Sequence, residues 1–400
     1  MMKFFHIRYF YGLIIKVMII PIFYITLIFL LGCNTDKQNN AMKTPPAYYK
    51  QENLPLYLPF SLHVDPMEKL LLVNFEKDPD RVYIGFEPQY FKDPENGEGL
   101  LVIAWRKDMH IDVYHESTLF PDPSKFDIAG KGLGCMQVVE FQKKKFEIFD
   151  NGVSVDIAFT DKFQRKIQVL ISESNAKKRK PFGLLAPMGD AASNPSSMPL
   201  VFLYDFYFVR RNQTLFNVII DNREHHPDKL PIPMDGAWMY FVRYSPDPFI
   251  VTFNPAQAGK IYPVLESEYV IELEKNGNGK EIKSLKKTTK GHQISLTFFP
   301  AFPQFNLIQD GIMTTGKFEI MAEESTGKVK GTYRIKTEEG KVHISINPDA
   351  GWEPKADRLS LKFLYAFAKT FKNWPKSYEW SATLKEENGN WHMDSHWKKL

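Results

Sequence analysis

Hydrophobic and polar residues alternate in short runs along most of the chain after residue 81. The runs are rich in β-branched and aromatic residues, and turn residues such as Asn96-Gly97 and Asn151-Gly152 separate neighbouring runs. A spacing near ten residues favours antiparallel strands joined by hairpins. The predicted strands cover residues 82–86, 100–105, 110–114, 136–141, 145–149, 153–159, 166–171, 200–209, 215–220, 238–244, 249–253, 269–274, 293–298, 316–322, 328–336, 342–346, 378–384 and 391–396.

Two segments predict helices instead. Asp65 is a good N-cap, Pro66 suits the first helical position, and Glu68 stands where it reaches back to the cap, so a short helix is expected to about Asn74. Within residues 358–372, apolar side chains recur at helical spacing before a proline. The chain is therefore predicted to be all-β with one or two short helices.

The composition of the chain fits an ordinary globular protein, and its length favours two or three domains, with a single large β domain as the alternative. With 44% hydrophobic residues, 24% charged residues and 2 Cys in 400 residues, collagen-like, disulfide-stapled and wholly disordered classes are excluded. Large antiparallel sheets close into barrels or sandwiches to hide their edges. We predict an N-terminal β domain over residues 59–215 and a C-terminal β domain over residues 216–400.

The first 33 residues have the pattern of a targeting segment. Basic residues precede an uncharged apolar run over residues 17–31, which ends in Gly32-Cys33. This order resembles a bacterial lipoprotein signal with its lipobox. The resemblance implies a lipidated Cys33 as the new N-terminus, a membrane anchor and a location in the cell envelope outside the cytoplasm. An uncleaved membrane span over residues 9–31 is the alternative.

Residues 34–58 are predicted to be a tether, because polar residues and prolines dominate them. If Cys33 carries lipid, Cys135 is the single remaining thiol and no internal disulfide forms.

The charge pattern excludes a nucleic-acid footprint. The formal net charge is +4, but Lys3, Arg8 and Lys16 belong to the targeting segment, which leaves 48 basic against 47 acidic residues. The chain has no P-loop, Gly-rich dinucleotide turn, Gly-x-Ser-x-Gly elbow or His-Glu-x-x-His motif. We therefore expect no nucleic-acid partner, no cofactor and no metal.

The first predicted hairpins carry a second resemblance. Residues 83–87, with the sequence Tyr-Ile-Gly-Phe-Glu, and the runs at 100–105 and 110–114 look like the opening of a lipocalin-like barrel. The overall plan is similar to the duplicated lipocalin-like proteins of the carotenoid hydratase and AttH type. The resemblance implies two antiparallel lipocalin-like domains, barrels or sandwiches, and an apolar small molecule in a barrel mouth.

One candidate site surrounds the strand predicted at 200–209. Both faces of this strand are apolar, so Asp205 is expected to be buried, where a carboxylate needs a partner or a shifted pKa. The functional interpretation is a general acid or base, and the alternative is a structural carboxylate. The long loop at 186–199 precedes the strand and supplies Asp190 as a second catalytic candidate, with Tyr204 as a ligand-binding candidate.

A second candidate cluster lies at residues 221–238, where potential ligands are densest. Adjacent histidines on a strand point to opposite faces, so their spacing is not that of a zinc motif, and a polar hairpin end is the alternative. The candidates are His225 for catalysis and Asp221, Arg223, Asp235 and Trp238 for ligand binding.

Three functions remain open at this point. The first is a tethered protein that binds an apolar or amphiphilic small molecule. The second is a hydratase-, isomerase- or hydrolase-like enzyme that uses Asp205. The third is a surface protein that binds a glycan or a partner through some of its 7 Trp, 18 Tyr and 32 Phe residues. An apolar pocket favours the first, converging carboxylate and imidazole groups the second, and a flat row of exposed aromatics the third.

Overall fold

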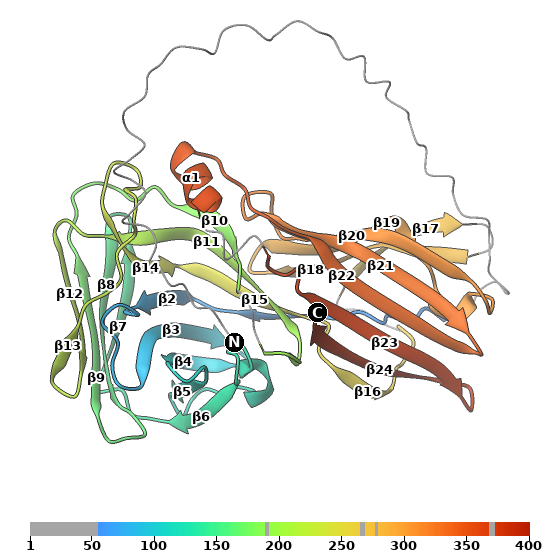
Figure 1. Ribbon diagram of the computed structural model, residues 1–400, viewed down its shortest axis with the longest axis horizontal. Helices are drawn as coiled ribbons and strands as arrows, with labels where there is room; N and C mark the ends of the chain where they lie inside the picture. The colour runs from blue at the N-terminus through green and yellow to red at the C-terminus, as the bar shows by residue number, and fades with distance from the viewer. Residues whose placement is uncertain (1–54, 189–191, 265–268, 277–278, 368–372) are drawn as a thin grey trace, which may run out of the picture. The chain divides into compact units, whose positions relative to one another are not determined.

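The computed structural model describes residues 55–188, 192–264, 269–276, 279–367 and 373–400. The signal segment with Cys33, most of the predicted tether and Asp190 lie outside the described residues. Figure 1 shows that strands dominate the described part of the chain. Every strand predicted from the alternating pattern overlaps an observed strand, so the mostly β fold is confirmed.

The strands form three sheets. A ten-stranded sheet has the order β1-β15-β11-β14-β2-β3-β4-β5-β6, with β10 added on β11, and only β5 and β6 pair in parallel within it. Its strands are β1 (Leu62–Pro66), β2 (Lys69–Asn74), β3 (Tyr83–Asp93), β4 (Gly97–Arg106), β5 (Ile111–His115), β6 (Leu133–Val138), β10 (Phe182–Ala186), β11 (Met198–Arg210), β14 (Met239–Ser245) and β15 (Asp247–Phe253).

The two other sheets are antiparallel throughout. A five-stranded sheet, in the order β13-β12-β9-β8-β7, contains β7 (Lys143–Phe149), β8 (Gly152–Thr160), β9 (Lys166–Glu173), β12 (Thr214–Ile220) and β13 (Arg223–His225). A nine-stranded sheet, in the order β16-β24-β23-β22-β21-β20-β19-β18-β17, contains β16 (Gln257–Lys260), β17 (Val270–Asn276), β18 (Gly279–Thr289), β19 (His292–Phe302), β20 (Met313–Met321), β21 (Lys328–Glu338), β22 (Lys341–Glu353), β23 (Tyr378–Glu387) and β24 (Asn390–Lys399).

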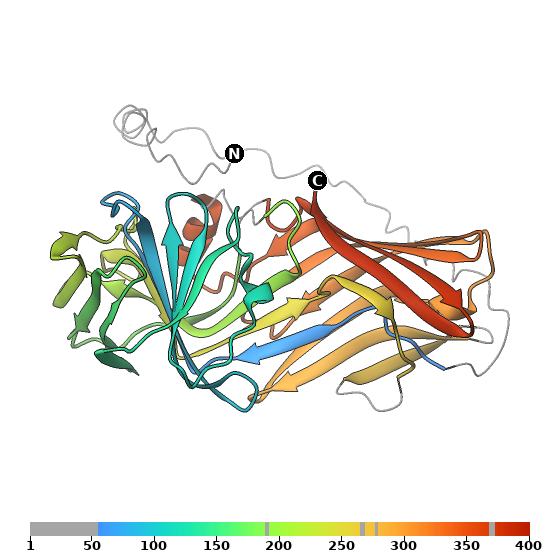
Figure 2. The ribbon, with the colours of Figure 1, turned by 90° about the horizontal axis from the view of Figure 1, so that it is seen from below.

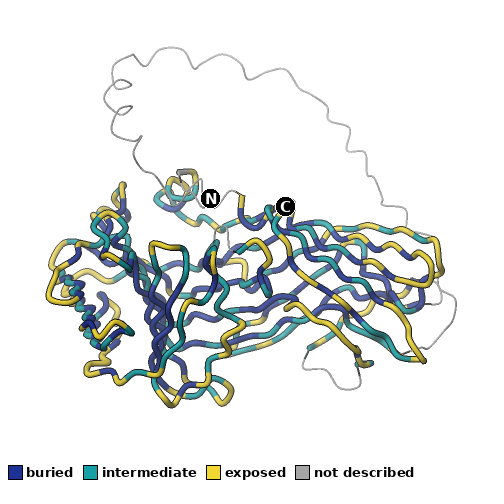
Figure 3. The backbone as a smooth tube through the Cα atoms, turned by 60° about the horizontal axis from the view of Figure 1, so that its bottom comes forward, coloured by how far each residue is buried: buried dark blue, intermediate teal, exposed yellow. Residues whose placement is uncertain are grey.

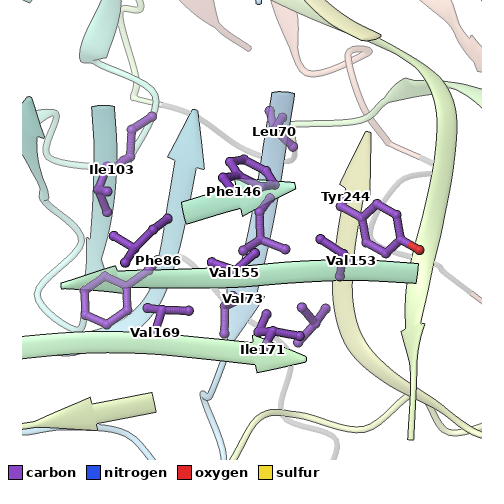
Figure 4. Close-up of a cluster of buried hydrophobic side chains, with 14 of the residues drawn as sticks. Leu70, Val73, Phe86, Ile103, Phe146, Val153, Val155, Val169, Ile171 and Tyr244 are labelled. Atoms are coloured by element: carbon purple, nitrogen blue, oxygen red, sulfur yellow. The ribbon is translucent and has the colours of Figure 1, made fainter. Parts of the chain in front are cut away.

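The first hydrophobic core fills the space between the five-stranded sheet and part of the ten-stranded sheet. Val155, Val169 and Ile171 of β8 and β9 point toward Val73 and Phe86 of β2 and β3 (Figure 4). All five side chains are buried. Alternate β-branched residues suit this arrangement because each strand presents every second side chain to the core.

The second hydrophobic core is rich in aromatic rings and lies against the curled nine-stranded sheet. The Phe60 ring centroid is 5.2 Å from that of Phe298, 4.7 Å from that of Phe302 and 6.0 Å from that of Trp380. Figure 2 shows β1, β11 and β15 between the five-stranded and nine-stranded sheets. Figure 3 shows buried residues along the middle of the strands and exposed ones at the hairpin ends.

Asp205 marks the point where β11 changes its neighbour. Residues 198–204 pair with β15, and the pairing with β14 begins at Tyr207. Asp205 has φ +52° at this irregularity, a left-handed conformation that aspartate tolerates better than most residues. The prediction that its side chain is buried was wrong, because the bend turns it outward and leaves it 52% exposed. The remainder of β11 is largely covered on both faces, as predicted.

One of the two predicted helices is present. Helix α1 (Leu359–Phe367) lies in the predicted segment and buries Leu361 completely; residues 368–372 lie outside the described part. The helix predicted from Asp65 to Asn74 was wrong, because these residues form the end of β1 and all of β2. Leu71 and Val73 are buried, and β2 pairs with β14 on one side and with β3 on the other. These tertiary contacts outweigh the helix-capping pattern that begins at Asp65. Two short 3₁₀ helices are also present, η2 (Pro123–Phe126) and η3 (Phe305–Leu307).

The predicted boundary between residues 215 and 216 falls inside strand β12. Strands from both predicted domains share sheets, since β14 pairs with β2 and β15 pairs with β1. The finer prediction, two separate lipocalin-like domains, stays a prediction. Among the described residues, no helix has the length and apolar character needed to cross a bilayer.

Candidate functional site

A pocket lies on one face of the ten-stranded sheet, and much of its apolar lining belongs to the first core. Its floor is built by β1, β3, β4, β11 and β15, and the segment 119–128 forms its cover. The apolar part of its wall comes mainly from Phe91, Leu101, Ile103, Leu119, Phe126 and Ile250. The cavity volume is about 80 Å³, well below the roughly 300–1,000 Å³ of sites for drug-sized ligands.

The strand registers place the floor residues side by side. Asp65 on β1 pairs with Ile250 on β15, which pairs in turn with Val201 on β11. On the neighbouring part of the sheet, Glu87 of β3 pairs with Ile103 of β4. The pocket therefore has carboxyl groups set between branched apolar side chains.

A glycine lets the cover segment approach the sheet. Gly97 opens β4 with φ +89°, and a Cβ atom at this position would collide with the backbone carbonyl of Thr118. A β-bridge joins Gly97 to Leu119, which lines the pocket. The Asn-Gly turn that predicted a hairpin thus also holds the cover of the pocket in place.

Glu87 is the most unusual group in the pocket. Its side chain accepts hydrogen bonds from Gln89 Nε2 at 2.9 Å and from Trp105 Nε1 at 3.1 Å, and the residue is only 7% exposed. Burial raises the pKa of Glu87, although these two hydrogen bonds and the charge of Arg243 act in the opposite direction. Raised pKa values of carboxyl groups in pockets are typical of functional sites.

A partly buried ion pair also lines the pocket. Lys125 Nζ lies 2.8 Å from both carboxylate oxygens of Asp65. Lys125 belongs to η2, whose N-cap Asp122 accepts a hydrogen bond from the Ser124 backbone at 2.9 Å. That backbone bond and a second one from the Ser124 hydroxyl lower the pKa of Asp122, so this exposed carboxyl is ionised at neutral pH.

Next to this ion pair, His63, Asp65 and Glu95 have ligand atoms within 4.8 Å of one another. His63 Nε2 lies 3.3 Å from Asp65 and 3.6 Å from Glu95. Because the Lys125 ammonium group already neutralises Asp65, we assign no metal to this cluster.

The described residues that the sequence singled out do not line this pocket. Asp205 Oδ2 lies 3.2 Å from Arg179 Nη2. His225 is buried, and its Nδ1 lies 2.9 Å from the Asp78 carbonyl oxygen, while Arg223 Nη2 lies 2.8 Å from Asp78 Oδ1. Both candidates therefore contact Asp78, His225 at its backbone carbonyl and Arg223 at its carboxylate, and Asp205 has a different partner.

The other candidates also have separate places. Asp221 has φ +52° in the β12–β13 turn, and Trp238 is 55% exposed. Asp235 fixes the start of α1, because its carboxylate accepts hydrogen bonds from Arg358 at 3.2 Å and Ser360 at 3.3 Å. The catalytic and binding roles assigned to these residues stay predictions.

Tyr204 lies at a junction between two sheets. Its ring stacks on His292 with 3.8 Å between centroids. His292 Nε2 is 2.7 Å from Asp247 of the ten-stranded sheet, and Nδ1 is 2.8 Å from Glu323, which follows β20. Burial works against the charged imidazolium, but the hydrogen bonds to the two carboxylates outweigh it and raise the pKa of His292.

Sequence reasoning missed the pocket groups Glu87, Gln89 and Lys125. A signal for the first two was present, because Glu87 and Gln89 occupy alternate positions of a strand whose neighbour is almost entirely apolar. The loop at 186–199, which its length predicts to be functional, does supply Met188, together with Ser197 and Pro199, to the pocket lining.

No family model matches the chain, and neither a curated protein nor a solved structure shows significant similarity to it.

Proposed function

We propose that this protein is a membrane-tethered, extracytoplasmic lipoprotein that binds a small amphiphilic molecule in the pocket of the ten-stranded sheet. The observation that carries the proposal is an apolar cavity with a buried carboxyl group on its floor. Binding sites for small molecules are mostly apolar and contain a few polar groups that orient the ligand.

The cavity volume limits the size of the ligand. About 10–15 Å³ holds one water-sized group, so a cavity of about 80 Å³ accommodates about five to eight non-hydrogen atoms. The occupant is therefore a short molecule or the end of a longer chain. A carotenoid-sized ligand does not fit inside this volume.

Fragment binding to the purified mature protein tests the pocket. We expect fragments of this size to give ligand-observed NMR signals of binding, and Ile250→Phe to abolish them by filling the floor. Ile148→Phe is the matched control, since Ile148 is also half-buried but belongs to β7, away from the pocket. Binding that survives Ile250→Phe contradicts the proposal.

The anchor has its own test. Because an apolar run ends in Gly32-Cys33, Cys33→Ser is expected to abolish labelling with a radioactive fatty acid and to leave the precursor uncleaved. Acyl labelling that is unchanged in this variant contradicts the lipoprotein assignment.

A further inference from the structure

We infer that the pocket selects a small organic cation, with an ammonium head group on a short apolar tail. This inference rests on the proposed function and specifies the class of ligand. It follows from the balance of charges around the cavity and from the hydrogen bonds that the charged groups already make.

The lining contains three carboxyl groups and one ammonium group, from Asp65, Glu87, Asp122 and Lys125. Lys125 contacts both oxygens of Asp65 at 2.8 Å, so these two charges compensate each other. Asp122 is exposed, accepts both hydrogen bonds of Ser124 on Oδ1, and has the charges of Lys125 and His63 acting on it. Glu87 remains.

Glu87 also receives its hydrogen bonds from neutral donors, Gln89 and Trp105. The cation whose charge acts on Glu87 is Arg243, whose Nη1 donates to Asn74 Oδ1 at 2.8 Å and to the Phe241 carbonyl at 3.4 Å. A carboxylate in a dry pocket interacts strongly with a nearby opposite charge, because little water screens the pair.

The remaining lining distinguishes between ligand classes. A carboxylate ligand would place a second negative charge beside Glu87, which is unfavourable at low dielectric. An alcohol would gain hydrogen bonds without a charge interaction. An ammonium group gains both, and the lining contains the aromatic residues Phe91 and Phe126, whose class of side chain attracts cations.

Three probes of nearly equal shape separate these cases: 3-methylbutylammonium, 3-methylbutan-1-ol and 3-methylbutanoate. Calorimetric titration of the mature full-length protein at neutral pH is expected to give at least about tenfold tighter binding of the ammonium than of the alcohol, and the weakest binding of the carboxylate. Equal affinities for ammonium and alcohol overturn the cation inference and leave the proposed function standing. Binding of none of the three overturns the proposed function itself.

Glu87→Gln tests which group carries the preference. The amide keeps the size of the side chain, and Gln89 can rotate its own amide to pair with it. The ratio of ammonium to alcohol affinity is expected to fall about tenfold toward one. Asp156→Asn removes an equal charge from β8, away from the pocket, and is expected to keep the wild-type ratio. An unchanged ratio in Glu87→Gln, with a circular dichroism spectrum like that of the wild type, overturns the inference.

Discussion

The aromatic core of the nine-stranded sheet and the pocket of the ten-stranded sheet differ in the side chains that fill them. In the aromatic core, the ring centroids of Phe298 and Phe302 lie 5.1 Å apart, and both rings pack on Tyr333 at 5.5 Å and 5.2 Å. Around the pocket, β3 supplies Glu87 and Gln89 to the lining in place of aromatic rings. The two regions therefore differ in that polar side chains stand among the apolar ones at the pocket, where a cavity of about 80 Å³ is left.

The largest expected effect comes from opening the filled region. Phe298→Ala removes a ring that is 1% exposed and has three aromatic neighbours, and it is expected to cost about 3–5 kcal/mol of the free energy of unfolding. Urea denaturation measures this cost. Phe120→Ala is the control, because that ring is 71% exposed and its loss is expected to cost at most about 0.5 kcal/mol. Similar costs for the two variants would contradict a tightly packed aromatic core.

The pocket is expected to respond to pH through Glu87. Because its pKa is raised above the ordinary value of 4.5, the folded protein holds this proton more tightly than the unfolded chain does. The stabilisation is present below about pH 4.5 and is lost as the pH rises through the folded pKa. Glu87→Gln removes this loss. Between the ordinary and the folded pKa, the stability of this variant relative to wild type should therefore grow by up to about 1.4 kcal/mol as the pH rises by one. Parallel pH profiles of the two proteins would show that Glu87 titrates normally.

The junction between the two regions is expected to show the same sign of pH dependence at a higher pH. The pKa of His292 is raised, so the bridge to Asp247 and Glu323 is fully formed below its ordinary value of 6.5 and weakens as the pH rises through the folded pKa. His292→Gln should flatten the loss of stability above this value, by about 1 kcal/mol. Thermal melts at a series of pH values measure it, and a wild-type profile without any such loss would contradict the bridge.

The smallest effect is expected at the bend of β11. Asp205→Asn keeps a residue that tolerates positive φ and loses only a half-exposed ion pair, so we expect a cost of about 0.5 kcal/mol. Asp205→Val is expected to cost about 1–3 kcal/mol, because a β-branched residue is strained in this conformation. If Asp205→Asn is the more damaging of the two, the charge matters more than the backbone geometry.

Much of the fold could be predicted because strand alternation is a local property of the sequence. Among the missed strands, β1, β10, β13 and β16 are short, and β18 is rich in lysine. The helix expected after Asp65 failed because sheet pairing on both sides of β2 outweighed a favourable cap.

The pocket could not be predicted because it is made by long-range packing. Asp65 and Lys125 meet across 60 positions of sequence, and neither segment alone indicates the other. At Asp205, an acid within an apolar strand predicts a buried group, whereas in the structure it marks a bend. An isolated polar residue in an apolar strand indicates either a buried polar group or a bend, and only the tertiary structure distinguishes the two.

The strand that passes from one neighbour to another at Asp205 also determines how the protein is expected to melt. β11 contributes Phe202 to the aromatic core and Phe208 to the core beneath the five-stranded sheet. Because β11 packs in both cores, unfolding of one core removes this strand from the other core. We therefore expect the two cores to unfold in a single cooperative transition. A fragment that ends at residue 215 would keep β11 but lose both of its long partners, β14 and β15, and would expose two rows of unpaired backbone groups to aggregation.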